Sequence, residues 1–254
     1  MKRALAVVVA ALALAGCAGE TGGDPASPSG AAGELTVYAA ASLQAPFREI
    51  GAEFEARNPG TRVVFDFAGS SDLVARLSQG AEADVLATAD TANMTEAVDA
   101  GLVAGDPVDF AANTLTIVTE PGNPLGTTGF VDLSRPGADV VVCAPQVPCG
   151  AATARIEQAT GVDLAPVSEE SSVTDVLGKV TSGQADAGLV YVTDARQAGD
   201  AVTTVPFPES AAAVNTYPVA VLADAENAPA AAFVAYVTGP DGRRILSEYG
   251  FAAP

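Results

Sequence analysis

Two stretches, LTVYAAASL at residues 35–43 and FAGSSDLVARLSQGAEADVLATAD at residues 67–90, decide the fold of this 254-residue chain. Each leaves a run of β-forming residues and enters a segment whose apolar side chains recur at helical spacing. The pattern predicts further strands over 61–67 and 84–87 and a helix over 91–100. Strands that alternate with helices are typical of a mostly parallel sheet covered on both faces. We therefore expect an α/β fold.

A second series of strands and helices begins near residue 113, and the chain returns to the first series near residue 215. We predict two lobes, each a mostly parallel sheet flanked by helices, with 34–112 and 216–254 in lobe 1 and 113–215 in lobe 2. The two crossings are expected to act as a hinge. Ligands in such folds lie in the crevice at the carboxyl ends of the strands. The elements predicted here are strands over 114–119, 140–144, 187–192 and 216–222 and helices over 151–159, 173–181, 229–236 and 241–249.

Residues 1–16 are typical of a targeting segment. A basic start precedes an apolar run over 4–14 that is too short for a permanent membrane-spanning helix. The sequence LAGC at 14–17 resembles the lipobox of bacterial lipoproteins, in which cleavage leaves a lipidated cysteine, here Cys17. Small, turn-forming and acidic residues then predict a flexible tether over 17–33. An ordinary secretory signal with an incidental cysteine is the alternative.

Charge and composition exclude several classes of function. The chain has 12 basic and 31 acidic residues, a formal net charge of −19 and no histidine. It therefore lacks a Ser/His/Asp or Cys/His catalytic system, and imidazole ligands for zinc. A serine hydrolase without histidine is also disfavoured, because GxSxG is absent and Lys179 has no serine three residues before it. The acidic excess argues against a phosphate-backbone partner. We expect neither an enzyme, nor a resident cofactor, nor a nucleic-acid-binding protein.

Two cysteines remain in VVCAPQVPCGAA, at Cys143 and Cys149. Outside the cytoplasm, two thiols six positions apart with prolines between them favour a disulfide. A reduced pair and a metal site are the alternatives. The metal site is weaker, because the sequence offers no second cysteine pair and no histidine.

Hydrogen-bond donors gather where strands are expected to end and helices to begin. Helix N-termini attract anions through unpaired backbone N–H groups and the helix dipole. If both lobes direct these ends into one cleft, they form a pocket of neutral donors suited to a compact oxyanion. Each residue also has a simpler explanation, because serines at helix starts are commonly N-caps and valine and tyrosine commonly pack in cores. The donors are on Ser42, Ser70, Ser71, Cys149, Gly150, Ser172, Val173 and Tyr191.

From residue 35 to the C-terminus, the sequence resembles the molybdate-binding proteins that serve ABC importers. The most specific match is the pair formed by AAASL and the segment from GSS to ADVLATAD. Further matches are APQVPCGAA, AGLVYVTDA, VNTYPVAVL and GPDGRRILSEYGF. The resemblance implies a type II periplasmic-binding-protein-like fold that captures molybdate, and tungstate, between its lobes and delivers it to an ABC permease. We expect an extracytoplasmic monomer, anchored to the cell membrane through lipid on Cys17.

Carried over residue by residue, the ligand contacts of that family fall on five residues. Ser42 and Ser70 would bind through hydroxyl and backbone N–H, Tyr191 through its hydroxyl, and Cys149 and Val173 through backbone N–H. Fixed neutral donors reject an oxyanion that leaves them short of partners, at a cost of about 1–3 kcal/mol for each. Such a site contains no titrating group, so we expect binding to vary little with pH around neutrality.

Two residues depart from the family's pattern. Cys149 stands where alanine is common, which keeps the backbone donor. Gly69 stands where a further serine is common, and we expect it to loosen or reshape the turn at Ser70. The nearest alternative is a protein of the same architecture that binds sulfate or phosphonate. A ferric-ion-binding protein is disfavoured by the lack of histidine and of adjacent tyrosines, and a structural or adhesion protein would not need donors from two lobes.

Overall fold

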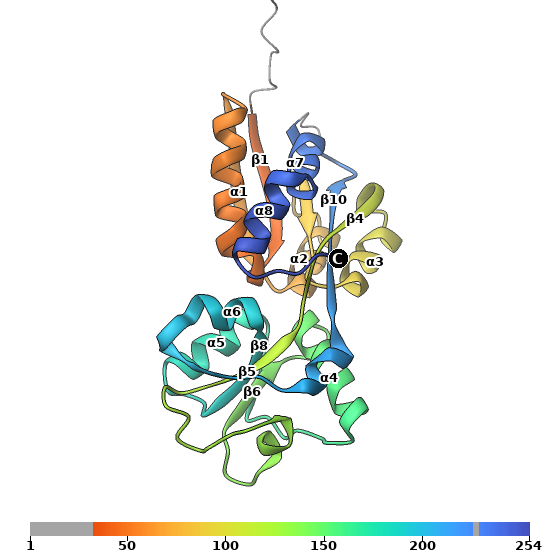
Figure 1. The fold of residues 1–254 in the computed structure, drawn as a ribbon. Coiled ribbons are helices and arrows are strands. Elements are labelled where there is room, and N and C mark those ends of the chain that lie inside the picture. Colours follow the sequence, from red (N-terminus) through yellow and green to blue (C-terminus); the bar gives the residue numbers. More distant parts are fainter. Residues whose placement is uncertain (1–32, 226–228) are drawn as a thin grey trace, which may run out of the picture.

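The computed structural model describes residues 33–225 and 229–254, which form two five-stranded sheets (Figure 1). The predicted signal peptide over 1–16, the lipidation of Cys17 and the tether as far as residue 32 lie outside the described residues. We call the first sheet with its helices the first lobe, and the second sheet with its helices the second lobe.

The strands of the first sheet are β1 (Gly33–Ala40), β2 (Thr61–Ala68), β3 (Val85–Ala87), β4 (Val103–Asn113) and β10 (Asn215–Leu222). Their order is β2-β1-β3-β10-β4. β1 pairs in parallel with β2 and β3, whereas β10 runs antiparallel to β3 and β4, so only β10 is reversed in this sheet. The register places Ala40 beside Ala68. The segments that follow these two residues therefore leave the same edge of the sheet.

The strands of the second sheet are β5 (Leu115–Thr119), β6 (Val140–Cys143), β7 (Ser168–Glu170), β8 (Ala187–Tyr191) and β9 (Thr203–Val205). Their order is β7-β6-β8-β5-β9. β6 pairs in parallel with β7 and β8, and β5 runs antiparallel to β8 and β9. Four strands again share one direction. The structure thus confirms the predicted α/β fold with two mostly parallel sheets.

Helices cover both faces of the first sheet. They are α1 (Gln44–Arg57), α7 (Pro229–Thr238) and α8 (Pro240–Glu248) on one face and α2 (Ser70–Ser78) and α3 (Thr91–Asp99) on the other (Figure 1). Strand side chains alternate between two apolar clusters, because successive residues of a strand point to opposite faces. Val37 belongs to the cluster with Phe47 of α1, and Tyr38 belongs to the cluster with Leu73 of α2.

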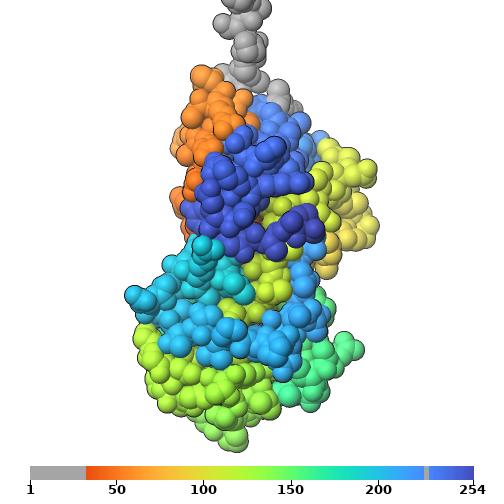
Figure 2. All heavy atoms as spheres, viewed as in Figure 1, coloured from red at the N-terminus to blue at the C-terminus, as the bar shows by residue number. Residues whose placement is uncertain are grey.

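The second lobe carries α4 (Pro148–Thr160), α5 (Val173–Thr181) and α6 (Val192–Ala198). The described residues also form four 3-10 helices: η1 (Ala41–Leu43), η2 (Phe130–Ser134), η3 (Gly199–Ala201) and η4 (Pro208–Ala213). In the space-filling view, α6 lies against the C-terminal part of the first lobe (Figure 2). At this contact, a Cβ added to Gly250 would lie 3.0 Å from Nη1 of Arg196.

The two lobes are joined by β4, which leads into β5, and by the segment that returns to β10. β4 and β10 pair as far as Asn113 and Asn215, so the two crossings lie side by side (Figure 1). The sequence pattern did not predict β4. Its first half is largely exposed and contains Gly105 and Pro107, and pairing with β10 overrides that weak propensity.

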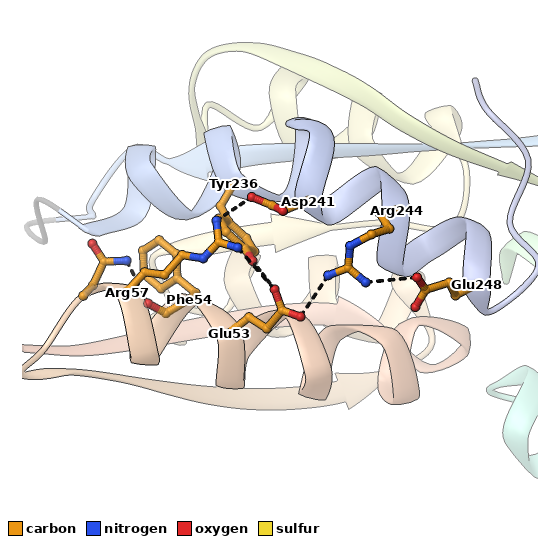
Figure 3. Close-up of polar contacts among 8 residues, drawn as sticks. Glu53, Phe54, Arg57, Tyr236, Asp241, Arg244 and Glu248 are labelled. Atoms are coloured by element: carbon orange, nitrogen blue, oxygen red, sulfur yellow. Dashed lines mark hydrogen bonds and ion pairs between the residues drawn. The ribbon is translucent and has the colours of Figure 1, made fainter.

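A charged cluster connects α7 and α8 to α1 (Figure 3). Glu53 of α1 accepts hydrogen bonds from the Tyr236 hydroxyl at 2.8 Å and from Arg244 at 2.9 Å. Arg57 donates to Asp241 and lies over the Tyr236 ring, 5.1 Å from its centroid. These contacts fix the C-terminal helices to the helix that follows β1.

Candidate functional site

The five residues predicted to contact an oxyanion line one cavity between the lobes. They are Ser42, Ser70, Cys149, Val173 and Tyr191. The remaining lining residues are small or apolar, and none of the described residues that line it carries a formal charge. The empty space of the cavity, including its mouth, is about 200 Å³. It lies at the carboxyl ends of strands from both sheets, where α/β folds place their ligands.

The first lobe contributes two buried hydroxyls. Ser42 lies in η1 after β1 and is 2% exposed, and Ser70 opens α2 after β2 and is 1% exposed. The Ser70 Oγ accepts a hydrogen bond from the Ala89 amide at 3.0 Å, so its own proton remains available to the cavity. The Ser42 Oγ lies 3.1 Å from the Tyr217 hydroxyl.

Neither serine caps its helix. The N-cap of α2 is Gly69, which has no side chain to do so, and no side-chain cap hydrogen bond forms at the start of η1 or α1. Capping, the simpler explanation of these serines, therefore does not hold. Ser172 differs, because its hydroxyl accepts from the Asp175 amide and caps α5.

The second lobe contributes two helix N-termini. Cys149 is the second residue of α4 and Val173 is the first residue of α5. The first backbone N–H groups of a helix have no partner within it, and the helix dipole adds positive potential there. Because α4 has 13 residues and α5 has nine, both ends can present backbone donors to an anion at the cavity wall.

Tyr191 ends β8 with its side chain 1% exposed. Its hydroxyl accepts a hydrogen bond from Asn215 Nδ2 at 2.7 Å. Burial, together with the nearby Tyr217 and Asp90, raises the pKa of Tyr191 well above its ordinary value. The phenol therefore remains protonated and can donate.

The loop before α4 is fastened by a disulfide between Cys143 and Cys149, each 2% exposed. The bond joins the end of β6 to the first turn of α4. Gly150 follows in that turn, where an added Cβ would lie 2.0 Å from the Ala144 carbonyl oxygen. The backbone must therefore pass this carbonyl closely, which only glycine permits.

Gly69 lies against the backbone of the second lobe at the cavity. An added Cβ there would lie 2.1 Å from the Ser171 carbonyl oxygen, across the cleft. The structure gives a further physical reason for this glycine, because the absent side chain lets the lobes meet. The expected effect on the turn at Ser70 stays a prediction.

Sequence reasoning missed two polar residues next to the cavity. Asn215 lies in the stretch VNTYPVAVL, and a polar residue at the start of a buried strand is a usable signal. Asp194, three residues after Tyr191, is 5% exposed and accepts from the Tyr191 amide at 3.1 Å. Burial raises the pKa of Asp194 to about 7. No pattern in the sequence shows that this carboxylate is buried.

The described residues contain no group of three or more His, Cys, Asp or Glu side chains that could hold a metal ion. Cys143 and Cys149, which could have bound a metal as free thiols, form a disulfide with each other. The cavity is therefore equipped with hydrogen-bond donors rather than with metal ligands.

Comparisons with known proteins agree with this architecture. The family of bacterial extracellular solute-binding proteins matches residues 35–252. The molybdate-binding protein ModA of Mycobacterium tuberculosis is 55% identical over 250 residues, covering 98% of this chain and 95% of the relative. ModA of Escherichia coli is 31% identical over 229 residues, covering 86% of this chain and 89% of the relative.

A solved structure shows the same fold. The periplasmic molybdate-binding protein of Azotobacter vinelandii superposes with a TM-score of 0.75 at 22% identity, covering 87% of this chain and 99% of that one. These relatives are solute-binding proteins, which agrees with the expectation that the chain is not an enzyme. The chain therefore belongs to the bacterial extracellular solute-binding protein family, and its relatives include molybdate-binding proteins.

Proposed function

We propose that this protein binds molybdate, and also tungstate, in the cavity between its lobes and delivers the anion to an ABC importer. The observation that carries the proposal is the convergence of donors from both lobes on a cavity lined without formal charge. The 55% identity to a molybdate-binding protein over nearly the whole chain supports the choice of anion.

The donor set matches a fully deprotonated tetrahedral dianion. The hydroxyls of Ser42, Ser70 and Tyr191 and the backbone N–H groups of Cys149 and Val173 can each donate to an oxygen of the ligand. A smaller oxyanion leaves some of these donors short of partners, which costs about 1–3 kcal/mol for each buried group. Phosphate that carries a proton needs an acceptor, and this set consists of donors.

Domain motion completes the proposal. We assign 34–112 and 216–254 to one moving lobe and 113–215 to the other, with the paired crossings as the hinge. Closure brings Gly69 against Ser171 and encloses the anion. The permease then recognises the closed form, which is an extracytoplasmic monomer anchored to the cell membrane through lipid on Cys17.

Calorimetric titration of the protein with molybdate, tungstate, sulfate and phosphate tests the anion directly. We expect tight binding of molybdate and tungstate and weak binding of the other two. Tight binding of sulfate without binding of molybdate would overturn the assignment in favour of another oxyanion. The mass of the N-terminal peptide tests the anchor, because an unmodified Cys17 contradicts it.

A further inference from the structure

Asn215 lies at the second crossing, behind the cavity, and is not among the five expected ligand contacts. It is the first residue of β10 and is 1% exposed. Its Nδ2 atom lies 2.9 Å from the Ala89 carbonyl oxygen in the first lobe and 3.2 Å from the Pro148 carbonyl oxygen in the second. One side-chain amide thus connects the cavity walls of both lobes.

The orientation of this amide is set by Arg155 of α4 on one side and by the Ala89 and Pro148 carbonyl oxygens on the other. Nη2 of Arg155 lies 2.6 Å from Oδ1 of Asn215. A guanidinium can only donate, so the amide oxygen faces Arg155 and the amide nitrogen faces the other way. On that side, Nδ2 of Asn215 lies 2.7 Å from the Tyr191 hydroxyl oxygen.

The direction of this hydrogen bond controls what Tyr191 offers to the cavity. Because Tyr191 accepts from Asn215, its own proton is left for another acceptor, which is the neighbouring Tyr217 hydroxyl in the empty cavity and a ligand oxygen once an anion is bound. We propose that Asn215, oriented by Arg155, is a positioning residue that makes the Tyr191 hydroxyl a donor to the bound oxyanion and so selects deprotonated oxyanions over those that carry a proton. This inference rests on the proposed oxyanion-binding function.

The replacement Asn215→Asp keeps the size of the side chain and reverses the hydrogen bond to Tyr191. It also loses the bonds to the Ala89 and Pro148 carbonyl oxygens, which lowers stability. A carboxylate at this position accepts the Tyr191 proton, and a lone pair of the phenol oxygen then faces the cavity. That lone pair repels a dianion but can accept the proton of hydrogen phosphate. The added negative charge weakens the binding of every anion, so the informative quantity is the ratio of molybdate affinity to phosphate affinity.

A double-mutant cycle, measured by calorimetry with molybdate, separates positioning from packing. It compares the parent with Asn215→Asp, Tyr191→Phe and the double variant. We expect Tyr191→Phe to weaken molybdate binding roughly tenfold in the parent, as the loss of one hydrogen bond to a charged ligand does. In the Asn215→Asp background it should cause no further loss, because Tyr191 no longer donates to the ligand there.

The ratio of molybdate to phosphate affinity gives a second readout, which a merely structural role would not move. We expect Asn215→Asp to lower this ratio by at least tenfold. Asn123→Asp is the matched control, because this substitution adds the same charge in a turn of the second lobe. The Asn123 side chain is hydrogen-bonded there to the backbone of Thr127. The ratio of this variant should equal that of the parent.

Arg155→Ala keeps the test decisive if Asn215→Asp fails to fold. Arg155 is exposed, and its removal leaves the amide held only by the two carbonyl oxygens that Nδ2 contacts. We expect several-fold weaker molybdate binding and a smaller effect of Tyr191→Phe in this background. If Tyr191→Phe costs the same factor in every background and the ratio is unchanged, Asn215 does not position Tyr191. If the parent itself does not bind molybdate, the proposed function fails, and this inference fails with it.

Discussion

The cavity between the lobes and the contact of α7 and α8 with α1 are both built from polar groups, with opposite chemistry. In the cavity, Ser42, Ser70 and Tyr191 are almost fully buried and carry no charge. In the α1 contact, the side chains of Arg57 and Arg244 are 52% and 46% exposed and pair with carboxylates (Figure 3). Water and salt screen the charged cluster, whereas the buried donors interact at low dielectric.

The difference shows where this molecule can carry charged side chains without a large desolvation cost. A guanidinium buried at the cavity would have to lose its hydration even when no ligand is bound. Neutral hydroxyls cost less to bury, because each already has a partner behind it. The ligand brings the charge, and the protein supplies oriented dipoles. Ionic pairs are left to the surface, where each contributes little but several together fix two helices.

The largest test of this comparison removes donors from the cavity. Ser42→Ala and Ser70→Ala should each weaken molybdate binding roughly 10- to 100-fold, because a hydrogen bond to a charged partner contributes about 1.5–3 kcal/mol. Calorimetric titration measures the loss. Ser134→Ala, an exposed serine of η2, is the control and should bind like the parent. Parent-like affinity of both cavity variants would place the binding site elsewhere.

The next test concerns the approach of the lobes. Gly69→Ala puts a Cβ against the Ser171 carbonyl oxygen. Neither of these two atoms can move away by a side-chain rotation. We expect the lobes to close incompletely and the molybdate affinity to fall roughly tenfold. Small-angle scattering should show a larger radius of gyration for the molybdate complex of the variant than for that of the parent. Gly178→Ala on α5 has nothing within 4 Å of the added Cβ and should change neither quantity. An unchanged affinity and radius for Gly69→Ala would mean that this contact does not limit closure.

Local signals in the sequence predicted the fold and a row of donors, and the resemblance to a known family selected the five residues that line the cavity. Apolar periodicity marks the strands and helices, and donors at strand ends mark the edge at which a ligand binds. No local pattern in the sequence predicts the close approach of the lobes at Gly69 or the orientation of the Asn215 amide. They depend on contacts between residues about 60 to more than 120 positions apart, such as Asn215 with Ala89, and these exist only after the two lobes meet.

The charged cluster should respond differently from the cavity. Glu53→Gln removes the shared acceptor of Tyr236 and Arg244 and should lower Tm slightly without changing molybdate affinity. The hydrogen bond from Tyr236, and then that from Arg244, lowers the pKa of Glu53. The contribution of Glu53 is therefore present at neutral pH and is lost as the pH falls below its ordinary pKa of 4.5.

Thermal unfolding at low and high salt measures this effect, which high salt should reduce. Arg62→Gln is the control, because the Arg62–Glu34 pair, at 3.5 Å, joins two more exposed side chains and should leave Tm unchanged. A large loss of anion affinity in Glu53→Gln would contradict the separation of the two regions.

Asp194 is an exception to this contrast, because it is a titratable carboxyl that is buried next to the neutral cavity. Burial raises its pKa to about 7, and the hydrogen bond from the Tyr191 amide opposes part of that rise. The folded chain therefore keeps a proton that the unfolded chain has lost, and the free energy of unfolding decreases as the pH rises from about 4 to about 7. Above that range, a charged carboxylate lies next to Tyr191, which lines a site for a dianion.

Molybdate affinity should accordingly decrease as the pH rises from about 6 to about 8, by less than tenfold if the ligand shifts this pKa by less than one unit. This qualifies the expectation of binding that hardly varies with pH. In Asp194→Asn, whose amide oxygen can still accept from the Tyr191 amide, titrations across the same range should give one affinity. If the variant keeps the pH dependence of the parent, Asp194 is not its source. If the parent shows none, the carboxyl does not change its charge near the ligand, and the cavity is neutral throughout.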